Sequence, residues 1–179
     1  MIDLRFVAPD LRRLDEVTAE VVACGVFRDT RPLTGLAGLV DWRLAGRLSR
    51  LARQGFLVGE VGEVLVMPIR ARLPFDKLLA FGLGPRASFS DETFRRALER
   101  VLDSLTGLSV KKAVVELPGR GEPVIDPERA TDILLEVLGN GNDEREALSF
   151  VEDGDGQKRI EKQALDRRRN ALRAQGART

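Results

Sequence analysis

Residues 77–117 read KLLAFGLGPRASFSDETFRRALERVLDSLTGLSVKKAVVEL, and they predict a strand, a helix and a second strand in succession. The apolar run at 77–83 stops at two glycines and a proline, which is typical of a sharp strand end. Ser90 is a suitable helix N-cap, and apolar residues at helical spacing then continue to Gly107. Residues 112–117 are again largely apolar. Alternation of this kind predicts an α/β domain.

The rest of the body continues the alternation. Further strands are expected at residues 2–7, 19–27, 63–69 and 147–152, and further helices at 37–53 and 127–138. The almost wholly apolar run 19–27 predicts a central strand. Trp42 is expected to pack within the first of these helices, and Phe56 to anchor the turn that follows it. We therefore expect residues 1–152 to form a three-layer α/β/α domain around a mixed sheet.

The C-terminal segment differs from the body in charge. Residues 158–179 hold eight basic and two acidic residues, a net charge of +6, whereas residues 1–157 hold 21 basic and 26 acidic residues, a net charge of −5. Residues 153–156 (Asp-Gly-Asp-Gly) predict a flexible joint, and the alternative of a calcium loop lacks the further spaced ligands. Residues 153–179 are therefore expected to be a linker and a basic helix. This helix is weakly amphipathic and is expected to dock on a partner or to fray.

Composition excludes several kinds of chemistry. The chain has no histidine and no tyrosine, so it lacks the commonest general base and metal ligand. Its one cysteine, Cys24, lies in an apolar run and is expected to be a buried small side chain. We expect neither a cofactor nor a metal site. The sequence shows no membrane-spanning run and no secretory signal, which predicts a cytoplasmic protein.

Several motifs occur in an order that resembles a known family. Val40-Asp41 is followed by Gly46, Leu48 and Leu51, then by the turn Gly55-Phe56-Leu57-Val58-Gly59-Glu60-Val61-Gly62, and the next strand ends in Gly82-Leu83-Gly84. The capped helix, the Val114-Val115-Glu116-Leu117-Pro118 strand and the 127–138 helix follow. This order is similar to the N-terminal domain of the leucyl (cytosol) aminopeptidase family. The resemblance covers residues 3–152 and implies a macro-domain-like α/β fold.

The resemblance also implies where the family chemistry lies. In that family a second domain holds two metal ions through a lysine and several carboxylates, and carries an Asn-Thr-Asp-Ala-Glu-Gly-Arg signature. This sequence contains no such signature, so no catalytic or metal-binding residue carries over. Residues 158–173 resemble the helix that connects the two domains of the family.

Three glycine-rich loops are candidate ligand sites, because backbone amides can hold phosphate oxygens. The candidate residues are Gly82, Gly84, Gly119, Arg120 and Gly121, with Gly139–Asn142 as a third loop. Arg120 adds a charge that suits a phosphate. Each loop has an alternative explanation as a simple turn.

Three functions follow from these observations. The first is a non-catalytic domain that acts in assembly or regulation through a protein partner or self-association, with a separate catalytic aminopeptidase chain as one such partner. Arg167, Arg168 and Arg169 are the candidate partner-binding residues. The second is a macro-like module that binds ADP-ribose or a related nucleotide. The third is nucleic-acid binding by the basic tail, which lacks the aromatic side chains that stack on bases.

Overall fold

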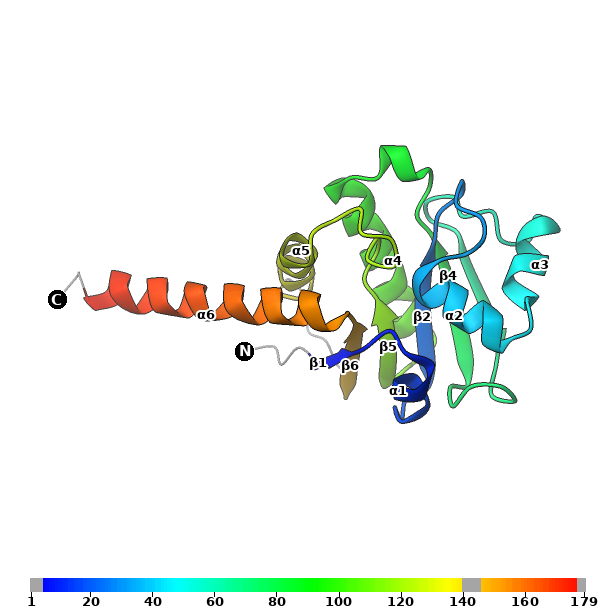
Figure 1. Cartoon of the computed structure of the whole chain (residues 1–179), viewed down its shortest axis with the longest axis horizontal. Helices are drawn as coiled ribbons and strands as arrows, with labels where there is room; N and C mark the ends of the chain where they lie inside the picture. The colour runs from blue at the N-terminus through cyan, green and yellow to red at the C-terminus, as the bar shows by residue number, and fades with distance from the viewer. Residues whose placement is uncertain (1–4, 140–145, 177–179) are drawn as a thin grey trace.

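The computed structural model describes residues 5–139 and 146–176 (Figure 1). Six strands form one sheet in the order β1-β6-β5-β2-β4-β3. Their bounds are β1 Arg5–Val7, β2 Val21–Val26, β3 Val64–Pro68, β4 Lys77–Gly82, β5 Lys112–Glu116 and β6 Ala147–Val151. Only the pair β3 and β4 is antiparallel within this sheet. The predicted mixed sheet is confirmed.

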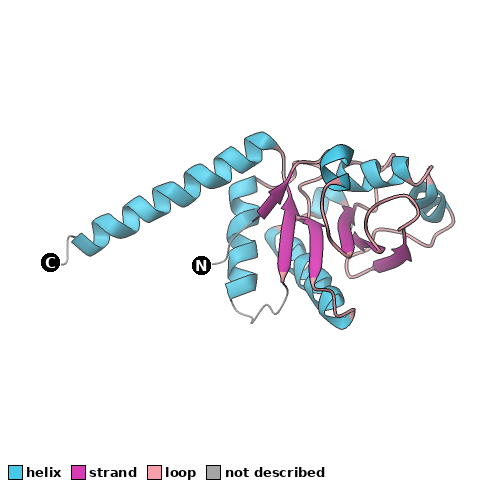
Figure 2. Cartoon of the chain, turned by 90° about the horizontal axis from the view of Figure 1, so that it is seen from below, coloured by secondary structure: helices cyan, strands magenta, loops and turns pink. Residues whose placement is uncertain are grey.

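Helices cover both faces of the sheet (Figure 2). They are α1 Leu11–Asp15, α2 Gly35–Arg43, α3 Arg47–Arg53, α4 Asp91–Gly107, α5 Pro127–Gly139 and α6 Gly154–Gly176, with a short 3-10 turn, η1, at Arg86–Ser88. Apolar residues of α4 and α5 pack on one face, and those of α1, α2 and α3 pack on the other. The three-layer architecture predicted from the sequence is confirmed.

The central strand β2 supplies both cores. Val21 and Ala23 belong to the core beneath α4 and α5, whereas Val22, Cys24 and Val26 belong to the core beneath α1 to α3. A strand that is buried on both faces has no reason to alternate apolar with polar residues. This double burial explains the continuous apolar run, and the predicted burial of Cys24 is confirmed.

Helix α4 follows its sequence signals closely. The Ser90 hydroxyl accepts a hydrogen bond from the Thr93 backbone N–H at 3.3 Å, as expected of an N-cap. The predicted apolar stripe is buried, and it consists of Phe94, Ala97, Leu98, Val101, Leu102 and Leu105. Its start at Asp91 and its end at Gly107 are those that the cap and the glycine predict.

The single helix predicted at residues 37–53 is wrong, because the chain forms two helices there. Between α2 and α3, Ala45 and Gly46 take positive φ angles of 54° and 74°. The Asp41 backbone carbonyl accepts from Gly46 N–H at 2.9 Å, and its carboxylate accepts from Ser49 N–H at 3.1 Å. Asp41 therefore ends one helix and caps the next. The apolar spacing runs through this break, so periodicity alone does not reveal it.

The expected packing of Trp42 and Phe56 is also wrong. Trp42 is 74% exposed and Phe56 is 66% exposed. Trp42 stands two positions after the buried Val40, about 200° around the helix, and therefore lies on the outer side of α2. After α3 it is Leu57, fully buried, that holds the turn in place.

The flexible joint expected at residues 153–156 is replaced by a helix start. Helix α6 begins at Gly154, and the Asp153 carboxylate accepts from Gly156 N–H at 2.7 Å as an N-cap. The helix then runs away from the body as one straight element (Figure 1). The loop expected at residues 140–143 and the first part of the expected strand 2–7 lie outside the described residues. Within residues 5–139 and 146–176, no helix combines the length and the apolar character needed to cross a bilayer.

Candidate functional site

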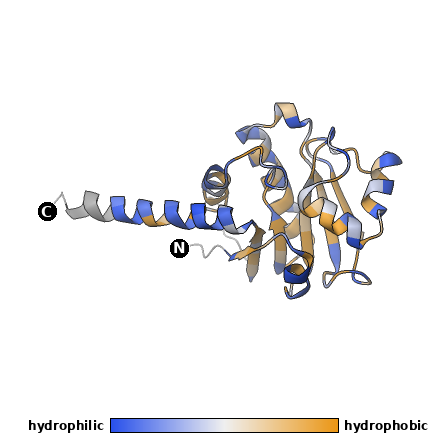
Figure 3. Cartoon of the chain, viewed as in Figure 1, coloured by the Kyte–Doolittle hydropathy of each residue, from blue (hydrophilic) through white to orange (hydrophobic). Residues whose placement is uncertain are grey.

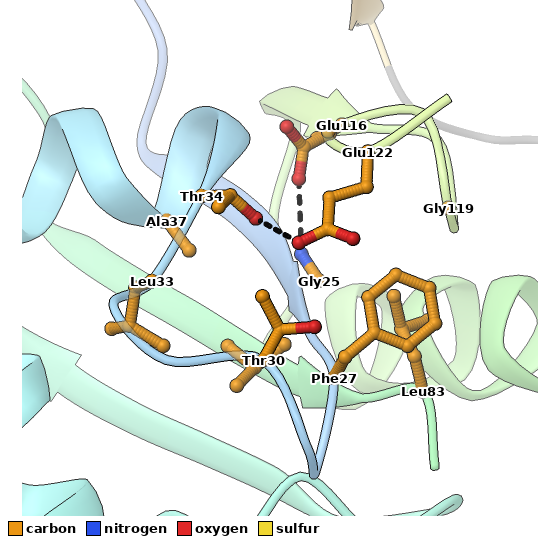
Figure 4. A pocket seen from close by; sticks show the side chains of 12 residues that line it. Gly25, Phe27, Thr30, Leu33, Thr34, Ala37, Leu83, Glu116, Gly119 and Glu122 are labelled. Carbon is orange, nitrogen blue, oxygen red and sulfur yellow. Dashed lines mark hydrogen bonds between the residues drawn. The ribbon is translucent and has the colours of Figure 1, made fainter. Parts of the chain in front are cut away.

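The candidate site is a cleft at the carboxyl edge of the sheet, where β2, β4 and β5 end. In open α/β sheets this edge is the usual place for a ligand. Phe27 and Leu83 line the cleft from the ends of β2 and β4, and Thr34 lines it from the loop before α2 (Figure 4). Glu116, the last residue of β5, and Glu122 complete its wall.

Glu116 carries the most unusual environment in the cleft. Its side-chain oxygens accept hydrogen bonds from Leu36 N–H at 2.7 Å and from Gly25 N–H at 3.3 Å. Leu36 lies in the first turn of α2, where backbone N–H groups lack helical partners. Thr34, the N-cap residue of α2, makes no capping bond with its side chain. The Glu116 carboxyl group therefore caps α2 from a neighbouring strand.

Burial controls the ionisation of Glu116. Desolvation raises the pKa of this carboxyl group to about 7, and the two backbone hydrogen bonds, which favour the charged form, oppose the rise only in part. The nearby Glu152 carboxylate raises the pKa further, whereas Arg120 lowers it. Glu116 thus changes charge near neutral pH, in a residue that is only 4% exposed.

Two glycines make room for the Glu116 side chain. A Cβ atom added to Gly35 would lie 2.7 Å from a Glu116 carboxylate oxygen, and one added to Gly121 would lie 2.5 Å from the same atom. Gly35 also has a φ of 58°, which larger residues rarely adopt. The loops before α2 and after β5 therefore close tightly around this carboxyl group.

Glu122 adds a second carboxylate to the cleft. It accepts a hydrogen bond from the Thr34 hydroxyl at 2.8 Å (Figure 4). It also forms a 2.7 Å ion pair with Arg86 of η1. Arg86 in turn donates its backbone N–H to Asp29 at 2.9 Å. These contacts join three segments across the mouth of the cleft: the loop between β2 and α2, η1, and the loop after β5.

The cleft is consequently small and acidic. Its free volume is about 10 Å³, the room of about one water molecule. Glu122 is paired with Arg86, and Glu116 is charged mainly above its pKa of about 7. Lack of room is therefore the main obstacle to an anionic ligand, and repulsion by the Glu116 carboxylate adds to it as pH rises. The chain's own side chains therefore close the carboxyl edge of the sheet, and the Glu116 carboxyl group caps α2 there.

The candidate ligand residues from the sequence lie in different surroundings. Gly119 and Gly121 line the cleft, as expected for a ligand loop. Gly82 and Gly84 instead pack against the 59–60 turn, with Gly84 N–H donating to the Gly59 carbonyl at 2.8 Å. An added Cβ at Gly82 would overlap the Glu60 carbonyl oxygen. These two glycines permit close backbone packing, and the structure leaves no space beside them for a ligand.

Arg120 turns away from the cleft and is already paired. Its Nε and one terminal nitrogen donate to the two Glu152 carboxylate oxygens at 2.8 and 2.6 Å, and its other terminal nitrogen donates to the Ile125 carbonyl at 2.7 Å. The side chains are 8% and 2% exposed. This buried bidentate pair ties the loop after β5 to the residue that follows β6, and it neutralises the charge that a phosphate would need.

Helix α6 is held against the body as far as Arg167, the fourteenth of its 23 residues. Arg159 bridges to Asp126 and Glu128 at 3.1 and 2.8 Å, and Arg167 bridges to Asp132 at 2.7 Å. Of the three arginines expected to bind a partner, Arg167 therefore lies against α5. Arg168 and Arg169 belong to the exposed part of the helix. The structure brings this trio together on α6 but far from the cleft.

No constellation for metal or nucleophilic catalysis emerges from the described part of the chain. Within it, no group of three or more His, Cys, Asp or Glu side chains is arranged to hold a metal ion. The only thiol, Cys24, is fully buried, and burial raises its pKa well above the ordinary value.

The sequence expectations missed Glu116 and Glu122 as residues of the cleft. Glu116 is a charged residue at the end of an otherwise apolar strand, and that position was a usable signal. Glu122 offers no comparable signal, because its neighbours Thr34 and Arg86 are distant in the sequence.

Comparison with known proteins agrees with this architecture. The family model of the cytosol aminopeptidase family, N-terminal domain, matches residues 21–147. A probable cytosol aminopeptidase of Halorhodospira halophila is 33% identical over 119 residues, which are 65% of this chain and 24% of that protein. The chain thus spans about a quarter of the length of the relatives it matches.

Solved structures show the same fold. A mutant of tomato leucine aminopeptidase superposes with a TM-score of 0.60 at 16% identity, over 89% of this chain and 35% of that one. The Oceanobacillus iheyensis macrodomain with ADP gives a TM-score of 0.66 at 14% identity, over 90% of this chain and 91% of that one. The match of the family model over most of the chain decides its membership: the chain belongs to the cytosol aminopeptidase family, through that family's N-terminal domain.

Proposed function

We propose that this chain is a non-catalytic member of its family that acts in assembly or regulation through protein–protein contacts made by α6. One observation carries the proposal: ion pairs hold α6 against α5 as far as Arg167, the helix then leaves the body, and within the anchored stretch the large apolar side chain of Leu165 is still 56% exposed. Most of the described helix is hydrophilic (Figure 3), and a single exposed leucine is not a contact surface by itself. The proposal therefore rests on Leu165 together with the adjacent exposed arginines and the projection of α6 from the body.

The arrangement suits a helix that docks on another protein. The anchored turns fix the direction of α6, so little conformational freedom is lost on binding. Arg168 and Arg169 come one turn after Leu165, at the point where α6 leaves the body, so an apolar contact and positive charge lie close together. A catalytic aminopeptidase chain and a second copy of this chain are the partners we propose to test.

The binding test uses purified full-length chain, measured by sedimentation velocity alone and with a catalytic aminopeptidase chain from the same cell. We expect a complex or a self-associated species. Leu165→Asp should weaken it at least about tenfold, since burying an unpaired carboxylate at an interface is costly. Leu108→Asp, at a second exposed leucine on the body, is the matched control and should leave association unchanged. A monomer in every mixture would refute the proposal.

The activity test is separate. We expect no hydrolysis of leucine p-nitroanilide by the purified chain with added Mn²⁺ or Zn²⁺. Turnover that survives rigorous purification, and is removed by a chelator, would contradict the non-catalytic part of the proposal while leaving the docking part open to its own test.

A further inference from the structure

Exposed basic and aromatic side chains follow one another along the chain from the end of α2, through α3, to the turn after it. We define this α3 surface by Trp42, Arg47, Arg50, Arg53 and Phe56. All five side chains are exposed, the two aromatic ones by 74% and 66%. The chain has only nine aromatic residues, and two of them lie on this small surface. Neither the cleft nor α6 uses any of these side chains.

The three arginines form a row that the fold does not need. At intervals of three residues they lie on one side of α3, which rises about 9 Å from the first to the last. The opposite side of α3 is apolar, with Leu48 fully buried in the core. Within the described part of the chain, Arg47, Arg50 and Arg53 make no ion pair. The neighbouring Arg43, by contrast, is paired with Asp15 at 2.9 Å.

The three arginines form a locally basic region on an otherwise acidic body. Helix α3 contains no acidic residue, and the nearby Asp41 is 9% exposed and bonded to Ser49. Residues 1–157 carry 21 basic and 26 acidic residues, a net charge of −5, so they carry −8 without these three arginines. An acidic partner is attracted by this basic surface and repelled by the acidic remainder of the body. The surface therefore favours an acidic partner.

We propose that the α3 surface binds an acidic protein segment that also carries an apolar anchor side chain. Arginine guanidinium groups bind carboxylates through paired N–H donors, and they do so best when no internal carboxylate competes. Trp42 comes five residues before Arg47 and Phe56 three residues after Arg53, so exposed apolar side chains flank the row along the chain. Tryptophan and arginine are also the residues that most often dominate binding energy in protein interfaces.

A nucleic acid fits this surface less well than an acidic peptide does. Three arginines neutralise at most three phosphates, whereas specific nucleic-acid sites contact about six to ten. Phosphates beyond those three would lie against the acidic body. A short acidic segment ends before it meets that charge.

The α3 surface is independent of the contacts proposed for α6. In Figure 1, α3 and the projecting part of α6 lie at opposite ends of the long axis of the molecule. Binding at the α3 surface therefore does not depend on binding at α6, and each can be tested separately. A chain with both surfaces occupied would link two partners.

Trp42 supplies the readout, because it is the only tryptophan of a chain without tyrosine. The probe is an acetylated six-residue peptide of alternating aspartate and leucine, whose three aspartate carboxylates match the three arginines, titrated into the chain at low salt. We expect a blue shift of the Trp42 emission as the exposed indole is covered, and an apparent Kd that rises with salt. A peptide with serine in place of leucine should bind more weakly, because it lacks the apolar anchors.

Two triple variants separate this surface from general charge. Arg47→Ala/Arg50→Ala/Arg53→Ala should weaken peptide binding by about tenfold, the sum expected of three exposed charge pairs. Arg72→Ala/Arg96→Ala/Arg100→Ala removes the same charge from other exposed positions and should bind as wild type. Circular dichroism should show both variants folded, because none of the six side chains is buried. Leu165→Asp, on α6, should leave peptide binding unchanged.

Three results would overturn the inference. One is an α3 triple variant that binds the peptide as tightly as the wild type does. Another is an equal loss in both triple variants, which would indicate only general charge attraction. The third is tighter binding of a ten-nucleotide oligothymidylate than of the peptide, which would assign the surface to single-stranded nucleic acid.

Discussion

Glu116 shows how one buried side chain can define a cleft. Its carboxyl group caps α2 through Leu36 N–H, reaches Gly25 N–H on β2, and requires glycine at positions 35 and 121. The positive end of α2 favours a negative charge there, while burial opposes it and raises the pKa to about 7. The N-terminus of α2, where an anionic ligand would bind, is therefore occupied by the Glu116 carboxyl group.

The raised pKa of Glu116 makes stability depend on pH. Unfolded, this carboxyl group releases its proton near its ordinary pKa of 4.5, and folded it does so at about 7. Between these values the folded state binds the extra proton, so stability falls as pH rises through that window. The expected loss attributable to Glu116 is up to about 3 kcal/mol, at about 1.4 kcal/mol per pKa unit.

The measurement is urea unfolding of wild type and Glu116→Gln at pH values from 4.5 to 8. The amide does not titrate, so wild type should lose stability relative to Glu116→Gln as pH rises to about 7, and the difference should then stay constant. A difference between the two proteins that is flat across the whole range would contradict the raised pKa.

The loop after β5 and the start of α6 are joined by one ion pair, Arg120 with Glu152. Its two N···O distances are 2.8 and 2.6 Å, and Gln157 adds a 2.7 Å bond from its side chain to the Glu152 carbonyl. These contacts set the point and the direction in which α6 leaves the body. The anchoring of α6 is thus built into the same loop that closes the cleft.

Removing one partner of this ion pair should lower the stability of the fold more than removing both. Arg120→Met leaves the Glu152 carboxylate buried without its partner, and we expect a loss of about 3–5 kcal/mol. Arg120→Met/Glu152→Leu removes both charges and should lose less than Arg120→Met alone. Urea unfolding of the two single variants and the double variant checks this. Losses that simply add in the double variant would show that the two side chains act independently.

Sequence patterns predicted those elements whose signals are local. Helix α4 carries its cap, its apolar stripe and its terminal glycine within one continuous segment, and all three were correct. The break between α2 and α3 was missed because it depends on a hydrogen bond from Ser49 to Asp41, inside an uninterrupted apolar spacing. Trp42 was misplaced for a different reason: it lies two positions after the buried Val40 and therefore on the outer side of α2, away from the sheet.

The candidate site could be predicted only in part. Gly119 and Gly121 were recognised as a loop at a strand end, and both do line the cleft. The Arg120 side chain was expected to face a ligand, but its direction is set by Glu152, 32 positions away in the sequence. Contacts between distant segments decide which way each loop side chain points, and a local pattern carries no information about them.

The molecule as a whole resembles macrodomains in fold, yet its cleft differs in character from an anion site. The space at the carboxyl edge of the sheet is about 10 Å³ and is bordered by Glu116 and Glu122. Fold alone does not determine which ligand a site accepts. The chemistry of these two carboxyl groups therefore weighs more than the overall likeness.

Isothermal titration of the full-length chain with ADP-ribose checks this point. We expect no binding heat at millimolar ligand, because the ligand would have to displace the Glu116 carboxyl group and face the Glu122 charge. Repeating the titration at pH 5.5 and at pH 8 covers both protonation states of Glu116. Saturable heat with a micromolar Kd at either pH would favour the nucleotide-binding alternative.

Cys24 has a consequence for how opening of the molecule can be followed. It is the only cysteine of the chain, it is fully buried in the central strand, and it lies next to Gly25, whose N–H bonds to Glu116. A thiol reagent can reach it only when the helices that cover this face of the sheet move away or the whole domain unfolds. Its labelling rate therefore measures how often this core opens, and no cysteine has to be introduced for the measurement.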